Sequence, residues 1–205
     1  MTRRQRGFTL VEVVIALTIV ATLLVIMFSG LRVGLAAWQR GDERAQALER
    51  TRSITHVITR TLGAAYPYQA SGTRNERPRL LFEGEPGRVA FVTAAPPFPA
   101  AEPAAFTAVT LAQTASPAPG LAVTQKALPN EKPFDAGLKP LLVDGAVTDI
   151  RFRYLKQSNG EWTERWDAAR EKALPLAVEV TMTVLQTGRA VEQSPLVVSV
   201  PVTKP

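Results

Sequence analysis

The amino-terminal segment from Phe8 to Phe28 limits the possible folds more than any other feature of this 205-residue chain. Seventeen of its 21 residues are apolar, and the exceptions are Thr9, Glu12, Thr18 and Thr22. With a rise of about 1.5 Å per residue, such a helix extends about 30 Å, the thickness of a bilayer's hydrocarbon core. Lipid favours a helix even for β-branched residues, because the backbone must satisfy its own hydrogen bonds there. The segment therefore predicts a membrane-spanning helix.

Three arginines, Arg3, Arg4 and Arg6, precede this segment and favour a cytoplasmic amino terminus by the positive-inside rule. The rest of the chain is then expected on the other side of the membrane. A cleaved secretory signal would have an apolar region of roughly 7–15 residues and a small-residue cleavage site. This segment is longer, and the sequence at residues 28–31 is a poor cleavage site. We therefore expect the apolar segment to be retained.

Glu12 is an acidic residue inside this apolar segment. A carboxylate costs roughly 2.5–3.5 kcal/mol at the centre of a membrane helix and less near an interface. Glu12 lies only about 6 Å from the start of the segment by helical rise. It is either an acid tolerated near the interface or a group that awaits a partner charge.

The stretch Arg6-Gly7-Phe8-Thr9-Leu10-Val11-Glu12 resembles the class III signal of type IV pilins and type II secretion pseudopilins. That signal has a short basic leader ending in Gly, then Phe, then an apolar helix with Glu at its fifth position. The resemblance implies that a prepilin peptidase cuts after Gly7 and that the new amine of Phe8 is methylated. It also implies that Glu12 serves assembly, because its carboxylate can meet the amine of a neighbouring subunit.

The helical pattern continues through residues 30–63, where Ile54, Ile58 and Leu62 follow a period near 3.6. We expect the chain to divide into a leader peptide (1–7), a transmembrane and assembly helix (8–29), an amphipathic continuation (30–63) and a β-rich periplasmic head (64–205). One plausible helix–helix surface for a partner subunit consists of five residues, Leu31, Leu35, Trp38, Ala45 and Leu48. Gly30, Gly34 and Gly41 favour a bent or flexible stretch, with a close-packing face at Gly30-x-x-x-Gly34 as the alternative.

After residue 66 the sequence changes to short alternating runs separated by turn residues, which predict β-strands. The predicted strands are 79–83, 88–93, 106–112, 121–126, 140–143, 147–155, 161–166, 176–185 and 196–202. Strong turn signals lie at 84–87 and 158–160. The Ala- and Pro-rich stretch 94–125 is interpreted mainly as a poorly packed surface loop, with a partner contact or an edge excursion as alternatives.

The sequence offers little for catalysis. It has no cysteine and one histidine, His56, which excludes a disulfide scaffold, a thiolate zinc site and a histidine metal cluster. Common catalytic and calcium-binding motifs are missing, so we expect no enzyme, cofactor or metal, and solvated carboxylates at Asp135, Asp144 and Asp149. The net charge of +6 includes the three leader arginines, and the remaining arginines are scattered among acids, so nucleic-acid binding is not expected.

Weaker motifs resemble the J-type minor pseudopilins of the type II secretion system. They are Gly30-Leu31-Arg32, Phe82-Glu83-Gly84, Val89-Ala90-Phe91-Val92, Phe152-Arg153-Tyr154, Trp162, Trp166 and the segment 174–180. The resemblance implies an α+β pilin-like fold: a long amino-terminal helix, membrane-spanning and then amphipathic, packed on a head with two antiparallel sheets. It also implies a place in the pseudopilus tip with I- and K-type minor subunits and the major pseudopilin, in the bacterial inner membrane. A type IV pilus minor pilin and a membrane-anchored periplasmic enzyme remain the alternatives.

Overall fold

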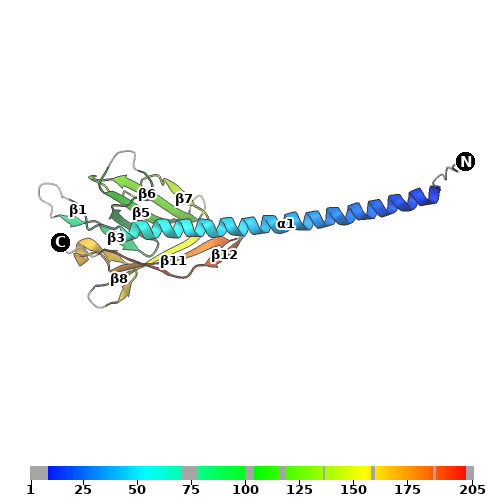
Figure 1. Ribbon diagram of the computed structural model, residues 1–205. Coiled ribbons are helices and arrows are strands. Elements are labelled where there is room, and N and C mark those ends of the chain that lie inside the picture. Colours follow the sequence, from blue (N-terminus) through cyan, green and yellow to red (C-terminus); the bar gives the residue numbers. More distant parts are fainter. Residues whose placement is uncertain are drawn as a thin grey trace, which may run out of the picture. The chain divides into compact units, whose positions relative to one another are not determined.

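The computed structural model describes residues 9–70, 78–99, 104–115, 119–135, 137–157, 160–186 and 188–201. The chain forms two compact units, Met1–Gln46 and Ala47–Pro205. The described part of the first unit is helical from Leu10 onward. The second unit, which we call the head, contains the last turns of the same helix and every described strand (Figure 1).

Helix α1 (Leu10–Gly63) is 54 residues long and covers the first predicted helical segment from Leu10 onward and all of the second. It ends where expected, because Pro67 follows and cannot supply the backbone N–H that a further turn needs. The chain then pairs with the sheet, because the N–H of Tyr66 donates to the carbonyl of Val92 at 2.8 Å. The end of the helix is therefore tied directly to a central strand of the head.

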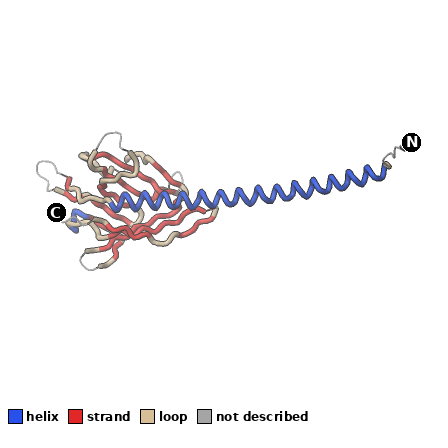
Figure 2. The backbone as a smooth tube through the Cα atoms, in the orientation of Figure 1, coloured by secondary structure: helices blue, strands red, loops and turns tan. Residues whose placement is uncertain are grey.

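The head contains two antiparallel sheets and a small two-stranded ribbon (Figure 2). The larger sheet has six strands in the order β10-β3-β4-β5-β6-β7. Their bounds are β3 (Phe82–Glu85), β4 (Arg88–Thr93), β5 (Thr107–Thr114), β6 (Gly120–Ala127), β7 (Leu142–Asp144) and β10 (Trp166–Asp167). The two main sheets confirm the predicted α+β fold, with a long helix followed by antiparallel sheets.

The second sheet has the order β12-β11-β8-β9, and β13 also pairs with β11. Its strands are β8 (Val147–Leu155), β9 (Trp162–Thr163), β11 (Ala177–Gln186), β12 (Arg189–Glu192) and β13 (Leu196–Ser199). The ribbon consists of β1 (Gln69–Ala70) and β2 (Arg79–Leu80), and a four-residue helix, α2 (Ala168–Glu171), follows β10.

The main core joins the end of α1 to both sheets. Ile58 and Leu62 of the helix are buried in one hydrophobic cluster with side chains of β3–β6 and of β8, β11 and β13. On β8, Ile150, Phe152 and Tyr154 are buried while Arg151 and Arg153 between them are exposed. This alternation is the one that the sequence predicts for a strand with one face on a core.

A second, smaller core covers the other face of the six-stranded sheet. Leu81, Val92, Ala108 and Leu128 form it, and Tyr68 and Phe106 pack at its margin. The rings of Tyr66 and Phe106 stack there with centroids 4.4 Å apart. This cover explains why β4 is buried on both faces from Val89 to Thr93, instead of alternating.

The two sheets are also joined by hydrogen bonds from β8 to the β3–β4 hairpin. The N–H of Phe152 donates to the carbonyl of Pro86 at 2.8 Å. The hydroxyl of Tyr154 donates to the carbonyls of Glu85 (3.1 Å) and Arg88 (3.3 Å). The Tyr154 ring crosses Gly84, where an added Cβ would lie 2.3 Å from the ring carbon Cζ. The glycine in this strand is therefore a packing requirement.

Three secondary-structure predictions for the head need correction. The strand predicted at 79–83 is two strands, because β2 belongs to the ribbon and β3 to the six-stranded sheet. The stretch 94–125 is not simply a poorly packed loop, because β5 and much of β6 lie in it and place Val109, Leu111 and Val123 in the main core. The threonines Thr107, Thr110, Thr114 and Thr124 lie in these strands, and the described prolines of the stretch lie outside them. The predicted 106–112 and 121–126 strands, within this same stretch, are confirmed.

The single strand predicted at 161–166 is wrong. It is two short strands that belong to different sheets, since β9 pairs with β8 and β10 pairs with β3. Of the turn that precedes it, Ser158 and Asn159 lie outside the described residues, and Gly160 has a positive φ of 68°. Strand β12 was not predicted, because Arg189–Glu192 shows no buried face and every one of its residues is exposed.

Candidate functional site

The processing residues Gly7 and Phe8 lie outside the described residues, which begin at Thr9. Thr9 precedes the first helical residue, and its hydroxyl oxygen accepts the N–H of Glu12 at 3.3 Å. Thr9 therefore caps the helix, and Glu12 occupies the third helical position of a Thr-x-x-Glu capping pattern. A carboxylate in this first turn also interacts favourably with the helix dipole. The pattern is visible in the sequence, but our sequence reasoning did not use it.

The apolar segment presents its side chains outward on every side. The large hydrophobic residues from Leu10 to Phe28 are between 46% and 81% exposed. The hydroxyls of Thr18, Thr22 and Ser29 each donate to a carbonyl three or four residues earlier, at 2.7–2.8 Å. These groups consequently need no external partner, which suits them to lipid or to a packed helix bundle.

Among the described residues one helix, α1, is long and apolar enough to cross a membrane, with a mean hydropathy of 2.8 over its most apolar window. None of that window is buried within the chain. By its length and apolar composition, the helix is compatible with a single-pass membrane anchor.

The predicted partner-helix residues are all exposed, and Trp38 is 78% exposed. At about 100° per residue, Leu31, Leu35 and Trp38 lie within about 60° of one another on the helix surface. Asp42, whose carboxylate accepts the side-chain N–H of Gln46 at 2.9 Å, falls on this same side of the helix. The continuous apolar face is thus formed by Leu31, Leu35 and Trp38, while Ala45 follows the interruption and Leu48 belongs to the head. Its role toward a partner stays a prediction.

The carboxylates differ in their surroundings. Asp135 and Asp149 lie in polar surroundings, where Asp135 accepts the N–H of Gly137 at 2.9 Å and Asp149 pairs with Arg151 at 3.1 Å. Asp144 is not solvated as expected, because it is 6% exposed and pairs with Arg50 at 2.7 Å. In the part of the chain that the structure describes, no three His, Cys, Asp or Glu residues are grouped as metal ligands. His56 is an exposed residue of α1.

Among the described residues, Tyr154 has a strongly shifted pKa, and its role is structural. Burial raises the pKa of the Tyr154 hydroxyl well above its ordinary value, and the nearby Glu85 charge raises it further. Its hydrogen bonds run to two backbone carbonyls of the β3–β4 hairpin. This tyrosine therefore joins the two sheets and does not resemble a proton-transfer group.

Comparison with known proteins covers nearly the whole chain. Residues 29–195 match the family model described as type II secretion system (T2SS), protein J. Residues 2–28 match the prokaryotic N-terminal methylation motif. The chain is also 38% identical over 99 residues to a type II secretion system protein J of Xanthomonas campestris pv. campestris. That alignment covers 48% of this chain and 46% of the relative, so it spans less than half of either protein.

The two family matches meet at residues 28 and 29, within α1. The methylation motif covers the start of α1, and the protein J match includes the rest of the helix and the head through the first residues after β12. The match names a component of the secretion machinery, which favours the predicted secretion family over a type IV pilus subunit. Because this match extends over more than half of its residues, the chain belongs to the type II secretion system protein J family.

Proposed function

We propose that this chain is a minor pseudopilin that joins the pseudopilus tip, helps to initiate the filament and so supports export of folded proteins across the outer membrane. The observation that carries the proposal is the pairing of an N-terminal methylation motif at 2–28 with a protein J match at 29–195. The exposed apolar helix lies in the region of the methylation motif, and the sheets of the head lie largely in the region of the protein J match. The head acts here as a binding module and not as an enzyme.

Membrane insertion is the first step. Arg3, Arg4 and Arg6 stay in the cytoplasm, α1 crosses the inner membrane, and the head lies in the periplasm. While the leader is present, the arginines hold the helix in the membrane, because moving them into hydrocarbon is costly. Removal of residues 1–7 by the prepilin peptidase leaves Phe8 with a new amine, which is then methylated.

Glu12 then provides the charge that opposes this amine. In a low-dielectric helix bundle, the amine of Phe8 on one subunit and the carboxylate of Glu12 on another attract strongly. Desolvation offsets much of this attraction, so the pair contributes more to axial register than to net stability. A wrong axial offset leaves a buried charge without a partner, and such packings are disfavoured.

The partners are the I- and K-type minor pseudopilins and the major pseudopilin. The exposed face of Leu31, Leu35 and Trp38 supplies an apolar helix surface for one of them. Ala45, beyond Asp42, and Leu48, in the head, are proposed as further contact residues.

Substitution of Glu12 tests the proposal at its charged position. Glu12→Ala and Glu12→Gln each remove the intramembrane charge, so insertion should be equal or easier while crosslinks to neighbouring subunits and secretion both fall. Thr22→Ala is the matched control, because its hydroxyl is satisfied by its own helix and its loss changes no charge. Unchanged crosslinking and secretion in both Glu12 variants, with a normally folded head, would show that this carboxylate has no assembly role here.

Co-purification tests the partners. Full-length protein expressed with the I- and K-type subunits should be recovered as one heteromeric complex in detergent. Trp38→Ala should weaken that complex, whereas His56→Ala, on the same helix but outside the proposed surface, should not. Failure of the unaltered chain to bind either subunit would refute the tip assignment.

A further inference from the structure

The helical turns Ala47–Ser53 at the start of the head have little apolar packing of their own. Ala47 and Thr51 are half-buried, and the remaining side chains of this stretch are exposed. Ile54 is the first helical hydrophobic residue that packs against the main core, and full burial begins only at Ile58. Hydrophobic packing therefore contributes little to holding these first two turns of the head against the sheets.

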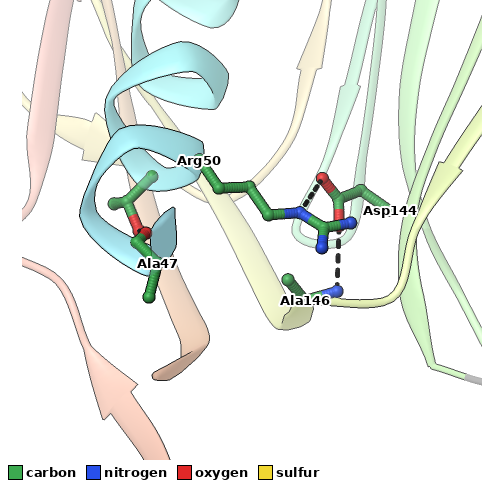
Figure 3. A network of polar contacts seen from close by, with 5 residues as sticks. Ala47, Arg50, Asp144 and Ala146 are labelled. Atoms are coloured by element: carbon green, nitrogen blue, oxygen red, sulfur yellow. Dashed lines mark hydrogen bonds and ion pairs between the residues drawn. The ribbon is translucent and has the colours of Figure 1, made fainter. Parts of the chain in front are cut away.

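One ion pair holds these turns to the sheet. Arg50 donates through Nη2 to Oδ1 of Asp144 at 2.7 Å and through Nε to Oδ2 at 3.2 Å (Figure 3). Among the described side chains of residues 47–53, these are the polar contacts that reach a strand. Thr51 donates to the carbonyl of Ala47, and Arg52 reaches Glu49, so both of those contacts stay within the helix.

Asp144 also organises the turn that follows β7. It is the last residue of β7, it pairs with Leu121 of β6, and its Oδ1 accepts the N–H of Ala146 at 2.9 Å. One carboxylate thus binds the helix and the β7–β8 turn together, as Figure 3 shows.

The two partners are buried unequally, since the side chain of Asp144 is 8% exposed and that of Arg50 is 57% exposed. A largely buried carboxylate is costly without a cationic partner, whereas the exposed guanidinium can be hydrated when the pair opens. The bidentate geometry adds strength and direction to the contact. The pair is consequently strong enough to hold a local segment, and its arginine can leave without unfolding the core.

We infer that the Arg50–Asp144 pair is a latch that docks helix residues 47–53 onto the β7–β8 turn, and that opening it undocks these turns while the head stays folded. When the latch opens, the helix stays attached to the head from Ile54 onward, where its packing on the main core begins. The inference concerns the chain alone and does not depend on the proposed function.

Thiol labelling of the full-length protein in detergent tests the latch, because the chain contains no cysteine and a single introduced one is unique. Thr51→Cys places a thiol at a half-buried position in the latched turns. Ala65→Cys, at a position 3% exposed in the main core, reports opening of the head as a whole. Each reporter is combined with Arg50→Met, Arg50→Lys and Arg52→Met, and the labelling rate is measured with a maleimide under native conditions.

Arg50→Met should raise the labelling rate at position 51 about tenfold, the factor that corresponds to about 1.4 kcal/mol. Arg50→Lys keeps the charge without the bidentate fork and should give a smaller increase. The rate at position 65 should not change, and Arg52→Met is the matched control because Arg52 is 78% exposed and reaches only Glu49. Equal rates at position 51 in the Arg50→Met and Arg52→Met proteins would overturn the latch. An equal increase at positions 51 and 65 would overturn it too, because the pair would then stabilise the whole head.

Discussion

The two ends of helix α1 share the same helical hydrogen bonding but have opposite side-chain patterns. From Leu10 to Phe28 the helix exposes large apolar residues on every side, and its hydroxyls bond to its own carbonyls. From Ile54 to Gly63 it buries one face, with Ile58 and Leu62 in a core shared with two sheets. The apolar side chains of the first part are not buried within the chain, whereas those of the second part pack within the head. Substitutions in the first part should therefore affect processing or the local helix, whereas substitutions in the head should affect its stability.

The largest expected effect concerns the first part and its leader. Gly7→Leu should abolish removal of residues 1–7 by prepilin peptidase, because a bulky side chain would occupy a site that the family fills with glycine. Intact-mass measurement after coexpression with the peptidase checks this, with Gly30→Ala as a glycine substitution outside the site. The head should fold equally well in both. Retention of the leader in the unaltered protein, or a cut near Gly30, would contradict the class III signal.

Gly84→Ala should strongly destabilise the head. The new Cβ would lie 2.3 Å from Cζ of Tyr154, so either β3 or the ring must move. We expect a loss of about 3 kcal/mol in the free energy of unfolding and a Tm lower by about 6–12 °C. Gly87→Ala is a matched control in the same hairpin, since its Cβ would meet Gln113 at an ordinary 3.7 Å. Similar melting curves for both variants would disprove the close-packing argument.

Tyr154→Phe should lower the free energy of unfolding by about 1 kcal/mol, because it removes the hydroxyl that bonds to the hairpin carbonyls of Glu85 and Arg88.

Tyr154 should also make the free energy of unfolding depend on pH in the alkaline range. Its raised pKa means that the unfolded chain loses this proton first, at about pH 10, so the free energy of unfolding falls as pH rises above about 10. Denaturant titrations at pH 8 and pH 10.5 should show a smaller decrease for Tyr154→Phe than for the unaltered protein. An identical decrease would show that this hydroxyl is not the group responsible.

Gly34→Ala should have the smallest effect, and of opposite sign to that of Gly84→Ala. No atom lies within 4 Å of a Cβ added at Gly34, and alanine favours the helix by about 0.5–1 kcal/mol. Hydrogen exchange of the surrounding helical amides should slow by about twofold to fivefold, the range set by that free energy. The Tm of the head should stay unchanged. Faster exchange at these amides would mean that a bend or a break at Gly34 is part of the native helix.

The long helix and most strands could be predicted because their signals are local. The apolar segment requires internal hydrogen bonding over its whole length, and α1 is continuous through it. Alternation predicted β8 at Val147–Leu155 with the same bounds that the structure shows. Period and composition describe which face of an element is apolar, and that information is present in neighbouring residues.

The remaining features depend on partners far apart in the sequence. Trp162 and Trp166 are four residues apart, yet their strands join different sheets because β8 and β3 offer the available edges. Asp144 looks like an ordinary turn carboxylate until Arg50, 94 residues earlier, is placed beside it. Gly84 is indispensable only because the Tyr154 ring crosses it. Backbone geometry and hydrophobic period act over a few residues, whereas pairing, burial of charge and close packing are decided when distant segments meet.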